Sequence, residues 1–210
     1  MQHPLFPRGV FDLVAVAASS GGVAALQQIV GALPTAFLTP LAIVQHCSPL
    51  LPSYLAQILG AKAARLAQYP QHGERLRAGR IYVAPPGSHL ILGAGACFAL
   101  EDSARLNYVR PSADRLFVSA AELLRERLLC VVLSGNGCDG AYGVRAASQY
   151  GSMVIVQDPI SAESPSMPEA AILTGAADLV LPLPVIAKAL QCLCEVAGAR
   201  EFFCGSQAAA

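Results

Sequence analysis

Short apolar runs alternate with stretches of helical periodicity along most of the chain, and glycine or proline separates one from the next. Apolar runs of this length are typical of strands buried in a parallel sheet, and the periodic stretches keep their apolar residues on one side of a helix. The expected strands are 12–18, 41–46, 81–84, 129–134, 153–157 and 178–181. The expected helices are 21–33, 50–59, 111–127, 139–150, 168–174 and 184–197.

This alternation predicts an α/β fold with a doubly wound, mostly parallel sheet and helices on both faces. Residues 89–93 and 97–101 flank a small-residue turn and predict a short antiparallel hairpin at an edge of the sheet. The chain shows no internal repeat, linker or break in composition. We therefore expect one domain over residues 12–197, preceded by an N-terminal extension, 1–11, and followed by a disordered tail, 198–210.

The composition excludes several classes of protein. Hydrophobic residues make up 54% of the chain and charged residues 13%, which argues against disorder. Lys plus Arg and Asp plus Glu both number 14, so no basic surface for nucleic acid is expected. No apolar run approaches the roughly 20 residues that cross a bilayer, so no membrane insertion is expected. The apolar stretch after Arg8 resembles a signal peptide, but Asp12 interrupts it and a strand fits better.

Cysteine and histidine positions argue against a metal site or a disulfide framework. The seven cysteines are odd in number and include no C-x-x-C pair, and the four histidines have no metal-ligand spacing. A reducing, cytoplasmic location without a bound metal is the simplest interpretation.

A serine, a histidine and an aspartate lie where three expected strands end. Ser19 follows the first strand, His46 ends the second, and Asp139 follows the fourth after a glycine-rich turn. Chemistry in open parallel sheets gathers beyond the carboxyl ends of the strands, so these residues could form a Ser-His-Asp triad. Their order along the chain matches none of the three common hydrolase orders.

Each of these residues also has an ordinary structural interpretation. Ser19 or its neighbour Ser20 could cap the following helix, as could Asp139, and His46 could be a loop histidine. His89 is a rival general base, although it begins the expected hairpin. In favour of chemistry, backbone N–H groups at the start of the helix after Ser19 could bind an oxyanion.

The segment 135–140 carries a competing signal, because it reads G-x-G-x-x-G between a strand and a helix. Asp158 follows about 20 residues later, as in a dinucleotide-binding fingerprint. Asp139, however, would place a carboxylate where a pyrophosphate should lie. A nucleotide-binding domain that uses Gly135–Gly140 therefore remains the alternative, but it leaves Ser19 and His46 unexplained.

Taken together, these segments resemble the catalytic domain of the chemotaxis protein-glutamate methylesterase (CheB) family. The similarity runs from about residue 12 to about residue 196. The segments that carry it are Ala17–Gly22, Gln45-His46, Tyr82–His89, Arg110–Phe117, Ser134–Gly140 and Ser166–Ala171.

The resemblance implies that Ser19 is the nucleophile, His46 the general base and Asp139 the triad aspartate. It makes His89 a feature of the family other than the base. It implies hydrolysis of glutamate γ-methyl esters on the cytoplasmic helices of methyl-accepting chemoreceptors, with deamidation of receptor glutamines as a further activity and no cofactor. The oxyanion and substrate-binding residues are expected to be Ser20, Gly21 and Asn136.

The chain departs from the family pattern at several positions. Ala17 replaces a glycine, Ser20 replaces a threonine, and Asn136 replaces a methionine, which predicts a more polar pocket. The family usually carries an N-terminal receiver domain, whereas only residues 1–11 precede the first expected strand. We expect either a stand-alone esterase or control by a receiver domain on a longer or separate chain. An inactive receptor-binding module is the remaining alternative.

Overall fold

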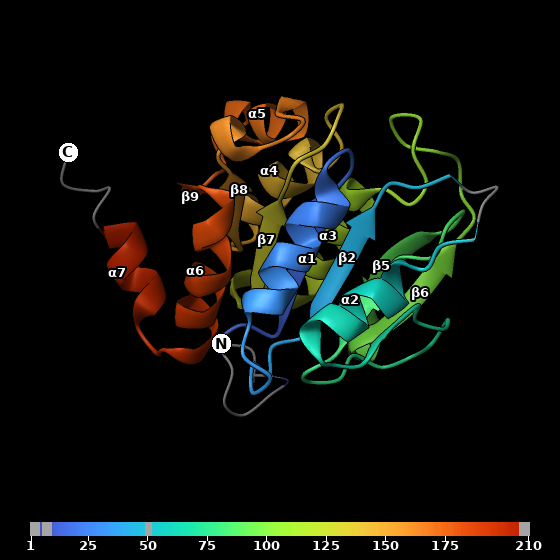
Figure 1. Ribbon diagram of the computed structural model, residues 1–210, viewed down its shortest axis with the longest axis horizontal. Helices are drawn as coiled ribbons and strands as arrows, with labels where there is room; N and C mark the ends of the chain where they lie inside the picture. Colours follow the sequence, from blue (N-terminus) through green and yellow to red (C-terminus); the bar gives the residue numbers. More distant parts are fainter. Residues whose placement is uncertain (1–4, 6–9, 49–51, 206–210) are drawn as a thin grey trace.

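A seven-stranded parallel sheet forms the centre of the molecule (Figure 1). The computed structural model describes Leu5, residues 10–48 and residues 52–205. The strands lie in the order β3-β4-β2-β1-β7-β8-β9, so the chain adds strands on both sides of β1, as predicted. Their bounds are β1 Leu13–Ala18, β2 Leu41–Gln45, β3 Ala67–Gln68, β4 Ile81–Val83, β7 Leu128–Val132, β8 Met153–Gln157 and β9 Leu179–Leu181.

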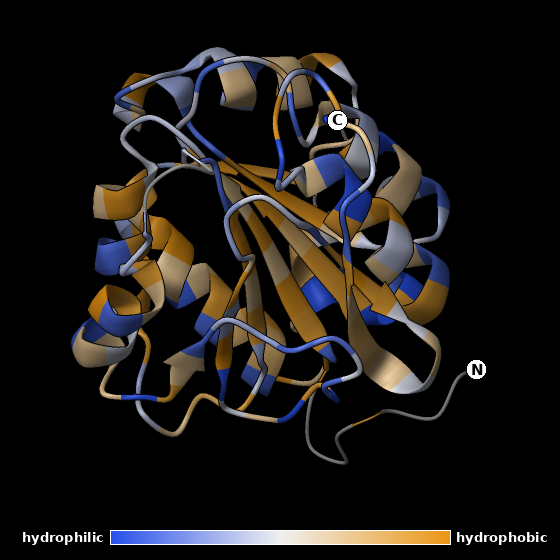
Figure 2. Cartoon of the chain, turned by 90° about the vertical axis from the view of Figure 1, so that its right-hand side faces the viewer, coloured by the Kyte–Doolittle hydropathy of each residue, from blue (hydrophilic) through white to orange (hydrophobic). Residues whose placement is uncertain are grey.

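Helices cover both faces of the sheet because the central strands are apolar on both sides. Within β1, Val14 and Val16 contribute to one core and Leu13 and Ala15 to the other. The first core is closed by α1 (Gly22–Ala32), α2 (Leu55–Ala63) and α6 (Leu183–Glu195), and the second by α3 (Ala113–Leu124), α4 (Ala141–Gln149) and α5 (Ser166–Leu173). Figure 2 shows the resulting apolar strands between the helix layers.

The antiparallel hairpin is present, but it is not joined to the main sheet. Strands β5 (His89–Gly93) and β6 (Cys97–Glu101) form a separate two-stranded sheet, with the short 3₁₀ helix η1 (Ala94–Ala96) between them. Its apolar side chains, such as Leu90 and Phe98, are buried in the core with α3 instead of lying beside an edge strand. The edge on that side is β3, a two-residue strand that the sequence pattern does not reveal.

Several boundaries differ from the sequence-based expectation. Helix α2 begins at Leu55, and residues 50 and 51 of the expected helix lie outside the described residues. The two other short 3₁₀ helices, η2 (Arg125–Arg127) and η3 (Pro159–Ser161), follow α3 and β8.

The C-terminal segment is more ordered than the sequence predicts. Helix α7 spans Ala199–Gly205, where a disordered tail is expected, because Ala199 is buried and Phe203 packs against the core that α6 closes. Residues 206–210 lie outside the described part. In the N-terminal extension, Phe11 is fully buried and the Leu5 N–H donates to Asp12, whose carboxylate also pairs with Arg127.

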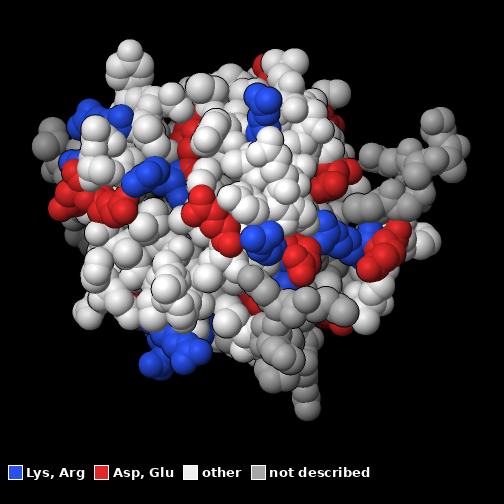
Figure 3. Space-filling view, turned by 180° about the vertical axis from the view of Figure 1, so that it is seen from behind, with Lys and Arg blue, Asp and Glu red and all other residues white. Residues whose placement is uncertain are grey.

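The surface and the cysteines agree with the composition. Acidic and basic side chains are interspersed over the face shown in Figure 3. The six cysteines whose side chains the structure describes are unpaired. In the same part, no helix combines the length and the apolar character needed to cross a membrane.

Candidate active site

The pairing of β1 with β2 brings Ser19 and His46 to neighbouring strand ends. The last register pair is Ala18 with Gln45, so Ser19 and His46 are the next residue on each strand. The His46 N–H donates to the Ala18 carbonyl at 3.1 Å, which extends the ladder by one step. Ser19 is half-buried and the His46 side chain is 12% exposed. The two residues are therefore close to each other and within reach of a ligand.

The loop after β7 meets these strand ends from the other side of β1. The Ser19 N–H donates to the Ser134 carbonyl at 3.0 Å, and Asp139 lies five positions further along this loop, just before α4. Strand order reverses at β1, and such a switch point is where open α/β sheets bind their ligands. The predicted meeting of the three segments at one edge agrees with this topology.

His46 and Asp139 form a hydrogen bond of 2.7 Å between Nε2 and Oδ2. Burial by itself raises the pKa of Asp139, but hydrogen bonds from His46, Ser112 and the Ala113 N–H outweigh it and lower the pKa. An ionised carboxylate only accepts hydrogen bonds, so His46 donates through Nε2–H. Within the described residues, Nδ1 of His46 has no hydrogen-bond partner and carries the lone pair of this tautomer.

The beginning of α3 fixes the Asp139 carboxylate. Oδ1 accepts from the Ser112 hydroxyl at 2.6 Å and from the Asp114 N–H at 3.2 Å, and Oδ2 accepts from the Ala113 N–H at 2.6 Å. In return, Oδ1 of Asp114 accepts from the Gly140 N–H at 2.9 Å and the Gly143 N–H at 2.7 Å, at the start of α4. Two helix N-termini, each favourable for an anion, thus hold the two carboxylates.

Sequence reasoning assigned no role at this site to Ser112 or Asp114. Ser112 precedes α3, which is a helix-capping position, but its hydroxyl bonds to Asp139 instead of to its own helix. The sequence shows that Ser112 stands at the start of a helix. It does not show that the hydroxyl of Ser112 bonds to Asp139, which is distant in the chain.

Gln45 is a further residue whose contribution the sequence did not specify. Its Nε2 donates to the carbonyl of Ser19 at 2.9 Å and to the carbonyl of His46 at 3.1 Å. The side chain is buried at the end of an otherwise apolar strand. The only sign of this role in the sequence is a polar amide at the end of an apolar strand. In the structure, this amide joins the backbones of Ser19 and His46.

The residues expected to bind an oxyanion lie around the turn between β1 and α1. Gly21 has a left-handed φ of 73° and immediately precedes α1, and the described residues offer no acceptor to the backbone N–H groups of Ser20 and Gly21. The Asn136 amide donates to the exposed Ser20 hydroxyl at 3.1 Å, and the Ser134 hydroxyl donates to the Ser20 carbonyl at 2.8 Å. The structure therefore brings Ser20, Gly21 and Asn136 together.

Close packing on Ser19 makes glycine necessary at position 135. A Cβ at Gly135 would lie 2.8 Å from the Ser19 Cβ and would overlap the Met167 sulfur. The Gly135 N–H and carbonyl bond to the Ser164 carbonyl and the Met167 N–H. The loop after β7 thus fits between Ser19 and the start of α5.

His89, the rival base, is fully buried and does not bond to Asp139. Its Nδ1 accepts from the Ser112 N–H at 3.1 Å, which leaves Nε2–H to donate to the Ala104 carbonyl at 3.1 Å. His89 therefore positions Ser112, and it contacts Asp139 only indirectly, through Ser112.

The geometry of the glycine-rich loop disfavours nucleotide binding. A pyrophosphate in such a motif binds the N–H groups that begin the following helix. Here the Gly140 and Gly143 N–H groups already donate to Asp114. Asp158, the expected ribose ligand, accepts from the Ile160 N–H and caps η3. No three His, Cys, Asp or Glu side chains in the described part of the chain are grouped to hold a metal ion.

Known proteins are similar to this chain in both sequence and fold. The profile of the CheB methylesterase family matches residues 14–190. A protein of Leptospira interrogans, provisionally named a protein-glutamate methylesterase and protein-glutamine glutaminase, is 34% identical over 85% of this chain and 92% of its own length. A protein-glutamate methylesterase of Myxococcus xanthus is 38% identical over 88% of this chain, which spans about half (55%) of that relative.

A solved structure agrees with these sequence matches. The CheB methylesterase catalytic domain of Thermotoga maritima superimposes with a TM-score of 0.82 at 33% identity, covering 86% of this chain and 97% of that domain. The comparisons favour an esterase fold over the nucleotide-binding alternative. Because the profile spans most of the chain and the relatives exceed 30% identity, the chain belongs to the CheB methylesterase family.

Proposed function

We propose that this protein is a serine esterase that hydrolyses glutamate γ-methyl esters on the cytoplasmic helices of methyl-accepting chemoreceptors and releases methanol. The 2.7 Å hydrogen bond between His46 and Asp139, next to Ser19 at the adjoining strand end, is the observation that carries the proposal. The names of its relatives agree with this chemistry. An enzyme that acts on these receptor segments would work in the cytoplasm.

In the first step, the Ser19 hydroxyl attacks the ester carbonyl and its proton passes to Nδ1 of His46. Nε2–H keeps its bond to Asp139, whose ionised carboxylate stabilises the imidazolium that forms. The two ring nitrogens thus exchange the roles that they have in the chymotrypsin-type triad, where Nδ1 faces the aspartate. The tautomer required for this step is the one that the Asp139 hydrogen bond favours.

The oxyanion of the tetrahedral intermediate is bound at the turn between β1 and α1. The backbone N–H groups of Ser20 and Gly21 serve as donors there, because the described residues give them no other acceptor. The Asn136 amide lies beside them through its bond to the Ser20 hydroxyl. A glycine at position 21 permits the left-handed backbone of this turn.

Protonated His46 then gives its proton to the departing methoxide, and methanol leaves. Water, deprotonated by the same nitrogen, hydrolyses the acyl-enzyme to a glutamate carboxylate and restores Ser19. Deamidation of a receptor glutamine follows the same path with ammonia as the leaving group. Neither sequence of steps calls for a cofactor.

Labelling with a fluorophosphonate tests the nucleophile, with intact mass as the readout. We expect one adduct on the wild type, none on Ser19→Ala, and an adduct retained on Ser20→Ala, which controls for the neighbouring hydroxyl. Loss of labelling in Ser20→Ala alone would make Ser20 the nucleophile. No adduct on the wild type would favour the alternative of an inactive receptor-binding module.

The substrate is tested with receptor cytoplasmic fragments that carry radiolabelled methyl esters. We expect volatile methanol to be released by the wild type and not by Ser19→Ala. An enzyme that is labelled by the fluorophosphonate but releases no methanol from any receptor fragment would be a serine esterase with a different substrate.

A further inference from the structure

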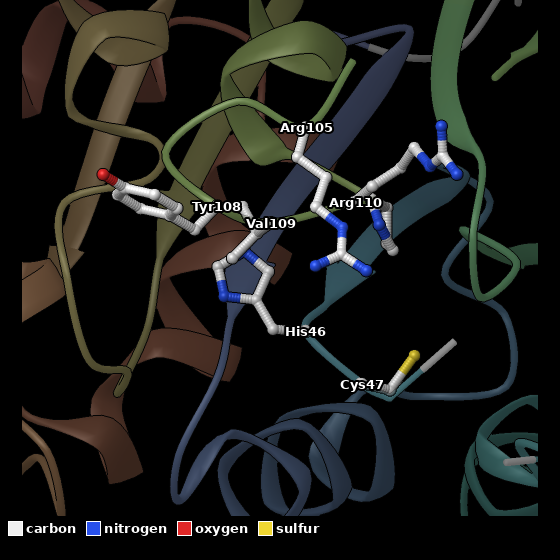
Figure 4. A pocket seen from close by; sticks show the side chains of 7 residues that line it. His46, Cys47, Arg105, Tyr108, Val109 and Arg110 are labelled. Carbon is white, nitrogen blue, oxygen red and sulfur yellow. The ribbon is translucent and has the colours of Figure 1, made fainter. Parts of the chain in front are cut away.

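A pocket of about 100 Å³ opens beside His46, outside the oxyanion turn (Figure 4). One wall is the segment after β2, with His46 and Cys47, and the other is the loop between β6 and α3, which contributes Arg105, Tyr108 and Arg110. His46 lines this pocket and also lies beside Ser19. A substrate whose ester reaches Ser19 would therefore extend along the pocket.

The pocket is cationic. Two of its lining residues are arginines and none is Asp or Glu. The Arg110 guanidinium is engaged, since Nη1 donates to the carbonyls of Asp102 at 2.7 Å and Ser103 at 2.8 Å. Arg105 is exposed, and its guanidinium has no hydrogen bond or ion pair with any described residue. In Figure 4 this guanidinium extends toward the space between His46 and Cys47.

The loop that presents Arg105 is a structured turn. Leu106 and Val109 exchange two backbone hydrogen bonds of 3.1 and 2.8 Å, and the Asn107 amide donates to Asp114 at 3.4 Å. Arg110 ties the same loop to its own beginning at residues 102–103. The loop backbone that carries Arg105 is therefore fixed beside the site, and the exposed guanidinium can bind a carboxylate through two hydrogen bonds.

We propose that Arg105 binds a carboxylate of the substrate, so that the enzyme prefers segments in which an acidic side chain lies close to the methyl ester. This inference rests on the proposed function. A methyl ester carries no charge for an arginine to neutralise, whereas a carboxylate beside it would form a charge-assisted, bidentate pair with the guanidinium. In a segment whose esterified residues are glutamates, an unesterified glutamate supplies that group.

Two synthetic peptides test the preference. The acidic peptide carries one glutamate γ-methyl ester flanked by glutamates, and the neutral peptide has serines in place of those glutamates. We expect Arg105→Gln to lower kcat/KM about tenfold on the acidic peptide, mainly through KM, and to leave the neutral peptide unchanged. Arg105→Lys restores part of the loss. Arg77→Gln is the matched control, an exposed arginine on the loop before β4, at the opposite end of the strands.

Equal losses on both peptides would overturn the inference, because Arg105 would then support the fold or the chemistry. Unchanged activity on both would overturn it as well. If the wild type hydrolyses neither peptide, the proposed function fails. The inference about Arg105 is then tested by measuring how tightly the acidic peptide binds. Fluorescence anisotropy would then compare the acidic peptide on Ser19→Ala with and without Arg105→Gln: weaker binding to the double variant supports the carboxylate site, and equal binding refutes it.

Discussion

Asp114 and Asp139 each accept hydrogen bonds from the helix that the other residue begins. Asp139 precedes α4 and binds the N–H groups of Ala113 and Asp114 in α3, whereas Asp114 binds those of Gly140 and Gly143 at the start of α4. The partner of His46 is thus oriented by the packing of two helices. The exchange also places two buried carboxylates side by side.

We expect this proximity to make stability depend on pH through Asp114. Burial, followed by repulsion from Asp139, raises the pKa of Asp114 from 3.8 to about 6. A carboxyl group with a raised folded-state pKa favours folding while it is protonated, and that contribution is lost as the pH rises from about 4 through 6. A pKa rise of this size corresponds to about 3 kcal/mol.

Asp114→Asn removes this titration while its carbonyl oxygen can still accept from Gly140 and Gly143. The free energy of unfolding of Asp114→Asn, relative to the wild type, is therefore expected to rise by up to about 3 kcal/mol between pH 4 and pH 7. Urea denaturation at several pH values measures it. Glu122→Gln, on the exposed side of α3, is the control and shows no such change. A pH-independent difference for Asp114→Asn would refute the prediction.

Asp139→Asn is expected to lower kcat by roughly 10³- to 10⁴-fold with an intact fold. An amide can present its NH₂ group to Nε2 of His46 and so favour the tautomer with the hydrogen on Nδ1, which cannot accept the Ser19 proton. Ester hydrolysis, together with circular dichroism, measures the effect. A variant with near-wild-type kcat would mean that Asp139 only caps α3.

The same substitution changes acid stability. Because hydrogen bonding lowers the folded-state pKa of Asp139, its stabilising contribution is present above about pH 4 and is lost as the pH falls. The unfolding free energy of Asp139→Asn is therefore expected to vary less than that of the wild type below pH 4. An identical acid dependence of both proteins would contradict the lowered pKa.

Gly135→Ala is expected to lower kcat by about 100-fold, because the new methyl group would push against the Ser19 Cβ and the Met167 sulfur. Steady-state kinetics measures the loss, and adding Met167→Ala restores part of it by removing one of the two contacts. Gly93→Ala is the control, since its Cβ would meet its nearest neighbour at an ordinary 3.6 Å. Full activity of Gly135→Ala would show that the loop after β7 can move without displacing Ser19.

Gln45→Met is expected to destabilise the protein by about 1–3 kcal/mol and to reduce kcat as well. Methionine has a similar size but cannot donate to the carbonyls of Ser19 and His46. Thermal unfolding and ester kinetics on the same preparation measure both effects. A loss of stability with unchanged kcat would limit Gln45 to a structural role.

Periodicity was sufficient to predict most of the architecture. Strands such as 153–157 and the two hairpin strands appear at the predicted residues, because apolar side chains on both sides of a strand leave a clear record in the sequence. The sequence shows no such pattern for the two-residue β3 or for the last helix, α7. Their stability comes from contacts with β4 and with the core closed by α6, which are distant in the chain.

The sequence by itself determined that Ser19, His46 and Asp139 follow strands of a parallel sheet, and parallel pairing places such residues at one edge. Only the tertiary structure decided which ring nitrogen of His46 faces Asp139, that Asp114 occupies the N–H groups a nucleotide would need, and that Arg105 lies beside the site. These relations join loops and helix ends whose spacing follows no period. They are fixed by the packing of α3 against α4 and by hydrogen bonds across the fold, which act only once the chain has folded.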